Sequence, residues 1–123
     1  MRAEIKSYYS DDDIGDPSAY QSNGADSVGY TLTFSIGPVG SEGSDNFEVV
    51  VTTPEDLQAY YAGKAPIFLR NCMLVENYNF SQILKLMTNY VTSLEEPSWD
   101  RLAEKLCRVA RWEFEDYRSF LLP

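Results

Sequence analysis

Two stretches in the first half of the chain alternate between apolar and polar residues. Residues 28–36 do so with threonine and serine at the polar positions, and residues 47–52 repeat the same period of two. This period is typical of strands with one buried face and one solvated face. Residues 37–44, which separate them, contain three glycines and a proline. We therefore predict that the two strands form a hairpin.

Two further strands are predicted. Residues 2–9 alternate around Ala3 and Ile5. Residues 67–75 follow Pro66 and are mostly apolar, with few charges, so we expect a strand in the centre of the sheet. Residues 10–23 collect acids, glycine and proline, which indicates a loop.

The period lengthens to three or four residues in the second half of the chain. Asn79 is a candidate N-cap for a strong amphipathic helix that extends to Leu94. After a break at Pro97, Ser98 is the candidate N-cap of a second strong helix whose apolar side continues to Ala110. The face opposite carries the basic residues Arg101, Lys105, Arg108 and Arg111, which we interpret as solvated.

A shorter helix and a terminal segment complete the pattern. Thr53 and Pro54 suit the start of a short amphipathic helix with Leu57, Tyr60 and Tyr61 on its apolar side, ending at Gly63. Residues 112–117 alternate aromatic and acidic side chains, which fits either a short strand or a docked extension.

This order of elements predicts an α+β fold. We expect a mainly antiparallel sheet of about four strands, with two long helices packed on one face. A length of 123 residues suits a single domain spanning residues 1–123.

Charge is distributed unevenly along the chain. The formal net charge is −9, and residues 1–63 contain eleven acidic residues against two basic ones, whereas residues 64–123 contain eight of each. Such a field disfavours nucleic acid and anionic membranes and steers cationic proteins toward the surface. An acidic surplus that serves solubility alone is the alternative.

The composition excludes several kinds of active site. The chain has no histidine, which rules out histidine-based triads and metal sites with histidine ligands. Cys72 and Cys107 lie in apolar stretches and are expected to be buried, reduced residues of a cytoplasmic protein, with a disulfide between them as the alternative. We also expect no leader, because no basic-then-apolar segment opens the chain, and no membrane span.

Two acidic motifs leave an enzymatic alternative open. Residues 11–16 resemble a calcium loop, but Gly15 and Asp16 are misplaced and the distal glutamate is missing. Glu113 and Glu115 form a carboxylate pair of the kind glycosidases use, although such pairs are common in an acidic chain. We predict no enzymatic activity, no cofactor and no metal, with a carboxylate- or calcium-dependent enzyme, or an unrelated adaptor or structural domain, as alternatives.

Several segments resemble a known family. The most specific are the Ile36-Gly37-Pro38 turn and the ending at residues 112–117; the others are residues 3–7, 34–43, 47–54 and 99–102. Their order and spacing along nearly the whole chain are similar to the Immunity protein 8 family of bacterial polymorphic-toxin systems. The resemblance implies an antitoxin that binds the toxin domain of a secreted or contact-delivered effector, as in contact-dependent growth inhibition. It supplies no enzymatic motif and no site residues.

Taken with the charge, the resemblance suggests a cationic partner. We expect the toxin domain to be basic, with a nuclease as the preferred candidate, and to be occluded by an acidic surface. The expected contact residues are Asp11, Asp12, Asp13, Asp16, Glu42, Asp45, Glu48, Glu55 and Asp56.

Overall fold

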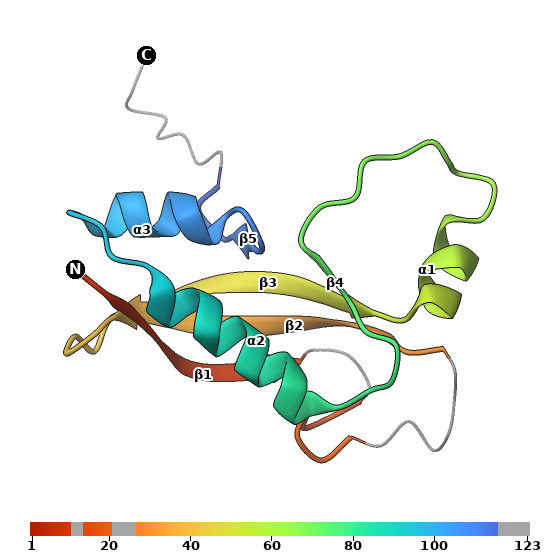
Figure 1. Ribbon diagram of the computed structural model, residues 1–123, viewed down its shortest axis with the longest axis horizontal. Coiled ribbons are helices and arrows are strands. Elements are labelled where there is room, and N and C mark those ends of the chain that lie inside the picture. Colours follow the sequence, from red (N-terminus) through yellow and green to blue (C-terminus); the bar gives the residue numbers. More distant parts are fainter. Residues whose placement is uncertain (11–13, 21–26, 116–123) are drawn as a thin grey trace.

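A three-stranded antiparallel meander forms most of the sheet. The computed structural model of the protein describes residues 1–10, 14–20 and 27–115. Strands β1 (Ala3–Ser10), β2 (Gly29–Pro38) and β3 (Asp45–Thr52) lie side by side (Figure 1). The β2–β3 ladder runs without interruption from the Gly29–Thr52 pair to the Ile36–Asp45 pair, so the predicted hairpin is confirmed.

Two short strands pair with β3 along the edge that faces away from β2. Strand β4 (Cys72–Leu74) pairs in parallel with Val50 to Thr52. Strand β5 (Arg111–Trp112) pairs antiparallel with Phe47 and Glu48. The terminal segment therefore begins as a strand, one of the two possibilities, and residues 116 and 117 lie outside the described part of the chain.

The prediction of a central strand over residues 67–75 is wrong. Only residues 72–74 are in a strand, and they lie at the edge of the sheet. Asn71 has a φ of 46°, a left-handed conformation that an extended strand does not adopt, so the ladder begins only after it. Residues 62–70 are exposed, although Ile67, Phe68 and Leu69 are apolar.

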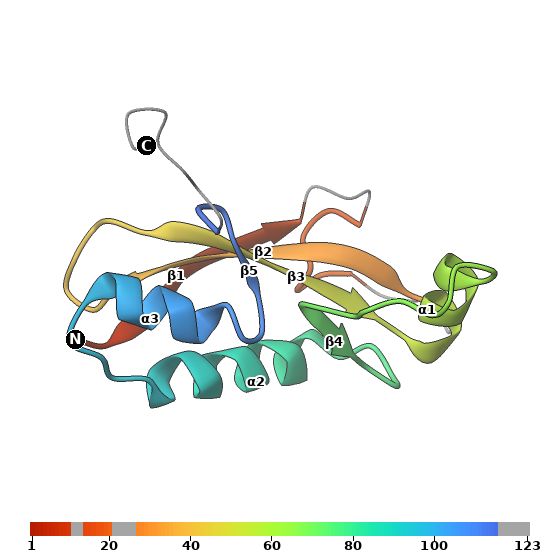
Figure 2. The same ribbon diagram turned by 90° about the horizontal axis from the view of Figure 1, so that it is seen from above.

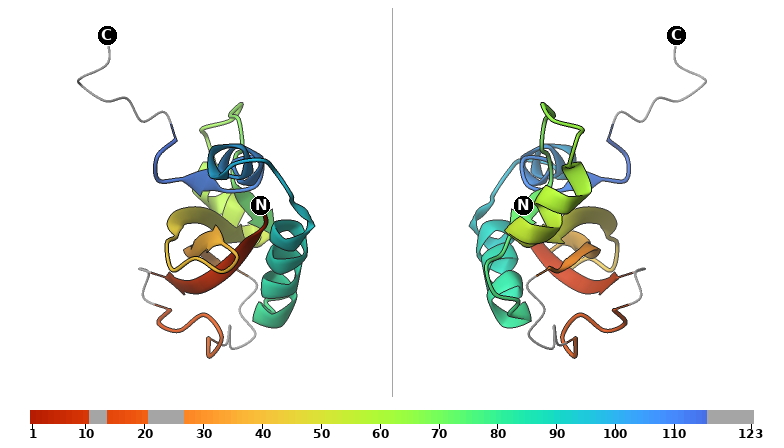
Figure 3. Two further views of the ribbon diagram at one scale, coloured as in Figure 1. Left: turned by 90° about the vertical axis from the view of Figure 1, so that its left-hand side faces the viewer. Right: turned by 90° about the vertical axis from the view of Figure 1, so that its right-hand side faces the viewer.

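The two helices of the second half of the chain cover the same face of the sheet. Helices α2 (Phe80–Ser93) and α3 (Trp99–Leu106) lie on one side in Figure 2. In the end views of Figure 3, α2 (teal) lies beside one face of the strands. The side chains buried between these layers are mainly those at the alternating apolar positions: Tyr30, Leu32, Phe34 and Ile36 of β2, Phe47, Val49 and Val51 of β3, Ile83, Met87 and Val91 of α2, and Leu102 and Leu106 of α3. The predicted α+β class is confirmed.

Helix α3 is shorter than predicted. It has eight residues and ends at Leu106, after which the amides of Arg108 and Val109 bond to carbonyls three residues back. These tighter bonds close a turn that leads the chain into β5. Ala110 is still buried, because the turn keeps the apolar side of the segment against the core.

Helix α1 (Pro54–Tyr61) begins as predicted, but none of its side chains is fully buried. The Thr53 hydroxyl accepts the amide of Asp56, and Gly63 follows the helix with a φ of 76°. The expected apolar side is not packed in the core, and Tyr60 is 64% exposed. Within the described ranges, no helix has the length and apolarity needed to cross a bilayer.

Candidate functional site

The expected acidic contact residues occupy several separate places. Asp11, Asp12 and Asp13 lie outside the described residues. Four of the others are exposed: Asp16, Glu42, Glu48 and Glu55. In the described part of the chain, the carboxylates of the last three form no hydrogen bond or ion pair, so they are available to a partner.

These exposed acids do not form one compact cluster. Glu42 lies in the turn between β2 and β3, whereas Glu55 lies in the first turn of α1, beyond the other end of the same ladder. The eight residue pairs of this ladder span about 25 Å, at roughly 3.3 Å per residue. Glu48 lies between them, paired with Thr33 and Arg111. A partner that contacts all three must therefore extend along the sheet.

Asp45 has a structural role that sequence reasoning missed. Its Oδ2 atom accepts hydrogen bonds from Nε1 of Trp99, at 2.7 Å, and from Nε1 of Trp112, at 3.0 Å. The Trp112 ring is stacked with Phe47, with ring centroids 6.3 Å apart. One carboxylate thus joins β3, α3 and β5, and only the tertiary structure brings the two tryptophans to it.

Asp56 is also engaged within the protein. Its Oδ2 atom accepts a hydrogen bond of 3.1 Å from the Thr52 hydroxyl, and its amide is capped by Thr53. The side chain is half-buried. Asp45 and Asp56 therefore stabilise the fold directly by joining different elements.

Asp16 stabilises the first loop. Its Oδ1 atom accepts hydrogen bonds from the hydroxyl of Ser18, at 2.8 Å, and from the amide of Ser18, at 2.9 Å. Because these bonds favour the ionised form, they lower the pKa of Asp16. Asp16 is thus a negative charge at an exposed position of this loop.

The face of the sheet opposite α2 and α3 is lined mainly by polar side chains. The cross-strand pairs there include Thr31 with Val50, Thr33 with Glu48 and Ser35 with Asn46. The Ser35 hydroxyl donates to the Asn46 side chain at 3.0 Å. At one end of this face, α1 contributes to a hollow of about 320 Å³, lined in part by Tyr60, Tyr61 and Asp56.

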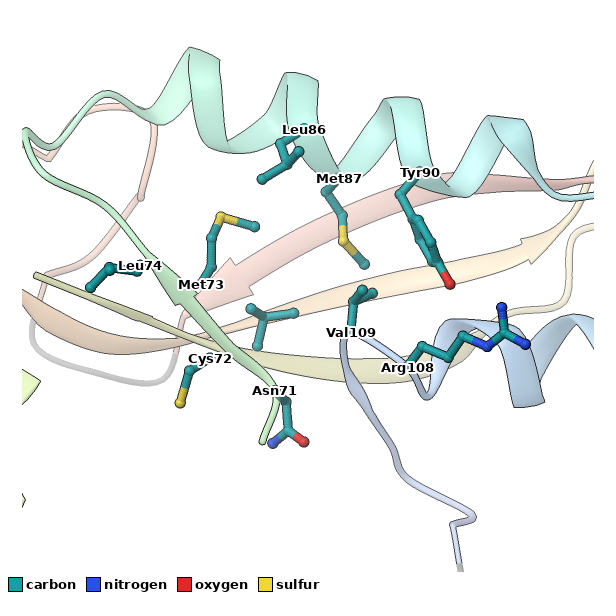
Figure 4. Close-up of a pocket in the computed structure, with 10 residues that line it drawn as sticks. Asn71, Cys72, Met73, Leu74, Leu86, Met87, Tyr90, Arg108 and Val109 are labelled. Atoms are coloured by element: carbon teal, nitrogen blue, oxygen red, sulfur yellow. The ribbon is translucent and has the colours of Figure 1, made fainter. Parts of the chain in front are cut away.

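A second group of hollows surrounds β4. On the helix side, a hollow of about 360 Å³ lies between β4, α2 and the turn after α3. Figure 4 shows Met87 and Tyr90 of α2 pointing into it from one side and Val109 from the other. On the other side of β4, a hollow of about 360 Å³ is lined by Leu57, Leu69 and Cys72, among others.

Exposed apolar side chains flank these hollows, and sequence reasoning placed several of them in the core. Leu69, Leu74 and Leu86 are 51%, 60% and 59% exposed, and Phe68 is completely exposed. The sequence contained a signal against a regular strand here. Ile67, Phe68 and Leu69 are consecutive apolar residues and lack the period of two that the confirmed strands show. Exposed apolar groups of this kind are typical of protein-interaction surfaces.

The described residues offer little reactive chemistry. Burial raises the pKa of the Cys107 thiol, which disfavours the thiolate. Both cysteines are free and half-buried. Residues 1–10, 14–20 and 27–115 contain no group of three histidine, cysteine, aspartate or glutamate side chains arranged to hold a metal ion.

Comparison with known proteins identifies the family. The family model described as Immunity protein 8 matches residues 3–117 of the chain. No curated protein and no solved structure gives a significant match. Since the matched region covers nearly the whole sequence, the chain belongs to the Immunity protein 8 family and is an immunity protein against a toxin.

Proposed function

We propose that this immunity protein neutralises a basic toxin domain, preferably a nuclease, by covering the toxin's cationic substrate site with an acidic surface. The observation that carries the proposal is the charge distribution. The entire net charge of −9 belongs to residues 1–63, and the described acids Glu42, Glu48 and Glu55 from this half are exposed.

The proposed inhibition is steric and electrostatic. A nuclease binds phosphates through lysine and arginine side chains. Carboxylates of the immunity protein would occupy the same cationic site and exclude the nucleic acid, without catalysing a reaction. The long-range field of the acidic half would also accelerate association with the toxin.

The contacts are assigned according to exposure. Asp16, Glu42, Glu48 and Glu55 are exposed and are proposed to face the toxin. The acidic residues 11–13 are proposed as contacts from the sequence alone. Asp45 and Asp56 belong to the same acidic half. Their proposed role at the interface is to position β3 and α1, which carry the contact residues Glu48 and Glu55. The proposed compartment is the cytoplasm, which the two free cysteines support, because disulfides are rare in reducing compartments.

Co-expression with the toxin domain tests the proposal. We expect the partner to be the C-terminal domain of a large secreted protein encoded beside this gene. We expect the immunity protein to restore growth, to co-purify with the domain and to inhibit its nuclease activity. A partner whose toxicity lies in another activity would contradict the nuclease assignment and leave the immunity role intact.

Charge reversal tests the acidic surface separately. Glu48→Lys and Glu55→Lys should each slow association in stopped-flow measurements about threefold to tenfold at low salt, with a smaller effect at high salt. Glu104→Lys, on the exposed side of α3 in the neutral half, is the matched control and should change the rate little. Equal effects of all three variants, or no salt dependence, would contradict binding through the acidic half.

A further inference from the structure

The geometry points to the outer edge of β4 as a second contact, which binds an extended segment of the toxin as an additional strand. This inference rests on the proposed function in that the partner is the same toxin domain. It assigns a different kind of contact, formed by main-chain hydrogen bonds and by apolar side chains that come mainly from the neutral half of the chain.

The hydrogen bonds between β3 and β4 show which backbone groups are available. The Val50 amide donates to the Asn71 carbonyl at 2.8 Å, and the Val75 amide donates to the Thr52 carbonyl at 2.9 Å. In a parallel ladder these bonds alternate, so Asn71, Met73 and Val75 bond toward β3. The amides and carbonyls of Cys72 and Leu74 consequently point away from the sheet, and no described strand pairs with them.

An added strand would find space for its side chains on both sides of β4. Side chains of a strand alternate between the two faces of a sheet. The helix-side hollow and the hollow around Leu57 and Leu69 lie on opposite sides of β4, and both are lined by Cys72, Leu74 and Arg108. Each has a volume of about 360 Å³. The two hollows therefore suit an extended segment whose apolar side chains point alternately to either side.

Charge complementarity further defines this segment. Among the described residues, the charged side chains that line the two hollows are Arg70 and Arg108, and none of the described carboxylates lines either one. Arg70 is paired with Glu115. Arg108 is exposed and makes no ion pair within the described residues. The toxin segment is thus expected to carry a carboxylate beside its apolar residues, even though the toxin domain as a whole is basic.

Main-chain hydrogen exchange tests strand addition directly. Residue-resolved NMR exchange would be measured on the full chain, alone and in complex with the toxin domain encoded beside its gene. We expect the amides of Cys72 and Leu74 to exchange quickly in the free protein and at least tenfold more slowly in the complex. The amide of Val75, already bonded to Thr52, is the internal reference for general stabilisation.

Matched variants separate main-chain from side-chain contributions. Leu74→Pro removes an outward amide without removing a hydrogen bond to β3, and proline is tolerated at such edge positions. Leu74→Ala removes the side chain and keeps the amide. Toxin affinity should be about fivefold or more weaker for Leu74→Pro than for Leu74→Ala.

A second pair of variants tests the charge and leaves β4 unchanged. Arg108→Glu should weaken toxin binding about tenfold. Arg101→Glu, at an exposed position of α3 that lines neither hollow, should have little effect.

The possible outcomes distinguish this inference from the proposed function. If the complex forms but exchange at Cys72 and Leu74 is unchanged and both variant pairs bind alike, strand addition is wrong and the acidic contact stands. If these amides become protected without toxin, in step with dimer formation, the occupant is a second copy and the inference is also wrong. If the domain neither binds nor has its toxicity relieved, the proposed function fails together with this contact.

Discussion

The Oδ2 atom of Asp45 lies 2.7 Å from Nε1 of Trp99, and this hydrogen bond joins the first residue of β3 to the first residue of α3. The same oxygen accepts the indole of Trp112 on β5. An acid from the highly charged half of the chain is thereby used to hold the C-terminal elements against the sheet. Net charge alone does not reveal which acids have such a role.

Replacing Asp45 should therefore affect stability. Asp45→Ala leaves two partly buried indole N–H groups without their acceptor, and we expect the free energy of unfolding to fall by about 2–4 kcal/mol. Urea denaturation followed by tryptophan fluorescence measures this change. Glu42→Ala, at an exposed position of the adjacent turn, is the control and should alter stability by less than about 0.5 kcal/mol. Similar stabilities for the two variants would refute the structural role of Asp45.

Gly37 should tolerate no side chain. A Cβ atom at this position would lie 1.9 Å from the carbonyl oxygen of Gly43, across the β2–β3 turn. Because the backbone must shift to relieve this overlap, Gly37→Ala should destabilise the protein by about 1–3 kcal/mol. At Gly43 the nearest atom to an added Cβ is Ser41 Oγ at 3.6 Å, an ordinary contact. Gly43→Ala should thus be close to neutral in the same thermal or urea denaturation, and a neutral Gly37→Ala would show that the turn can adjust.

The Thr53 hydroxyl connects α1 to Val28, the residue that directly precedes β2. It accepts the amide of Val28 at 2.9 Å and caps the amide of Asp56, and Thr53 is only 2% exposed. Thr53→Ala should lower the free energy of unfolding by about 2 kcal/mol, because both amides lose their acceptor. Thr53→Ser retains the hydroxyl and should recover most of this loss. If serine proved as destabilising as alanine, packing of the threonine methyl group would be the main contribution.

The hydrogen-bonded side chains of Tyr30 and Tyr78 should make the stability of the folded protein sensitive to alkaline pH. The hydroxyls of Tyr30 and Tyr78 are 2.8 Å apart, and Tyr78 donates to the Pro17 carbonyl at 2.8 Å. Burial raises the pKa of Tyr30, and the hydrogen bond with Tyr78 raises it further. Burial also raises the pKa of Tyr78. The neutral forms therefore stabilise the folded state fully below the ordinary tyrosine pKa of about 10.

This contribution should be lost as the pH rises above about 10. Urea denaturation between pH 8 and 11 should show a fall in stability that is smaller in Tyr30→Phe, which lacks one ionisable group. At pH 8 the same variant should be about 1 kcal/mol less stable than the natural sequence, because one hydrogen bond is missing. Parallel curves for the two proteins at alkaline pH would exclude Tyr30 as a cause of the pH dependence.

Local pattern was sufficient to predict the hairpin, the first strand and the starts of all three helices. These features depend on interactions within a few residues, such as the capping bonds of Thr53, Asn79 and Ser98. Local pattern was insufficient for residues 67–75, because apolar composition does not distinguish a central strand from an exposed segment that leads to a strand at the edge of the sheet. The deciding feature there was the left-handed backbone at Asn71.

The sequence by itself determined the α+β class, the uneven distribution of charge between the two halves of the chain and the absence of histidine chemistry. These properties follow from composition and from short-range periodicity. Only the tertiary structure decided which acids are available to a partner. Asp45 and Asp56 are engaged because tryptophans and a threonine from other elements meet them. The free edge of β4 was likewise decided by long-range packing, since pairing with β3 sets which backbone groups of Cys72 and Leu74 point outward.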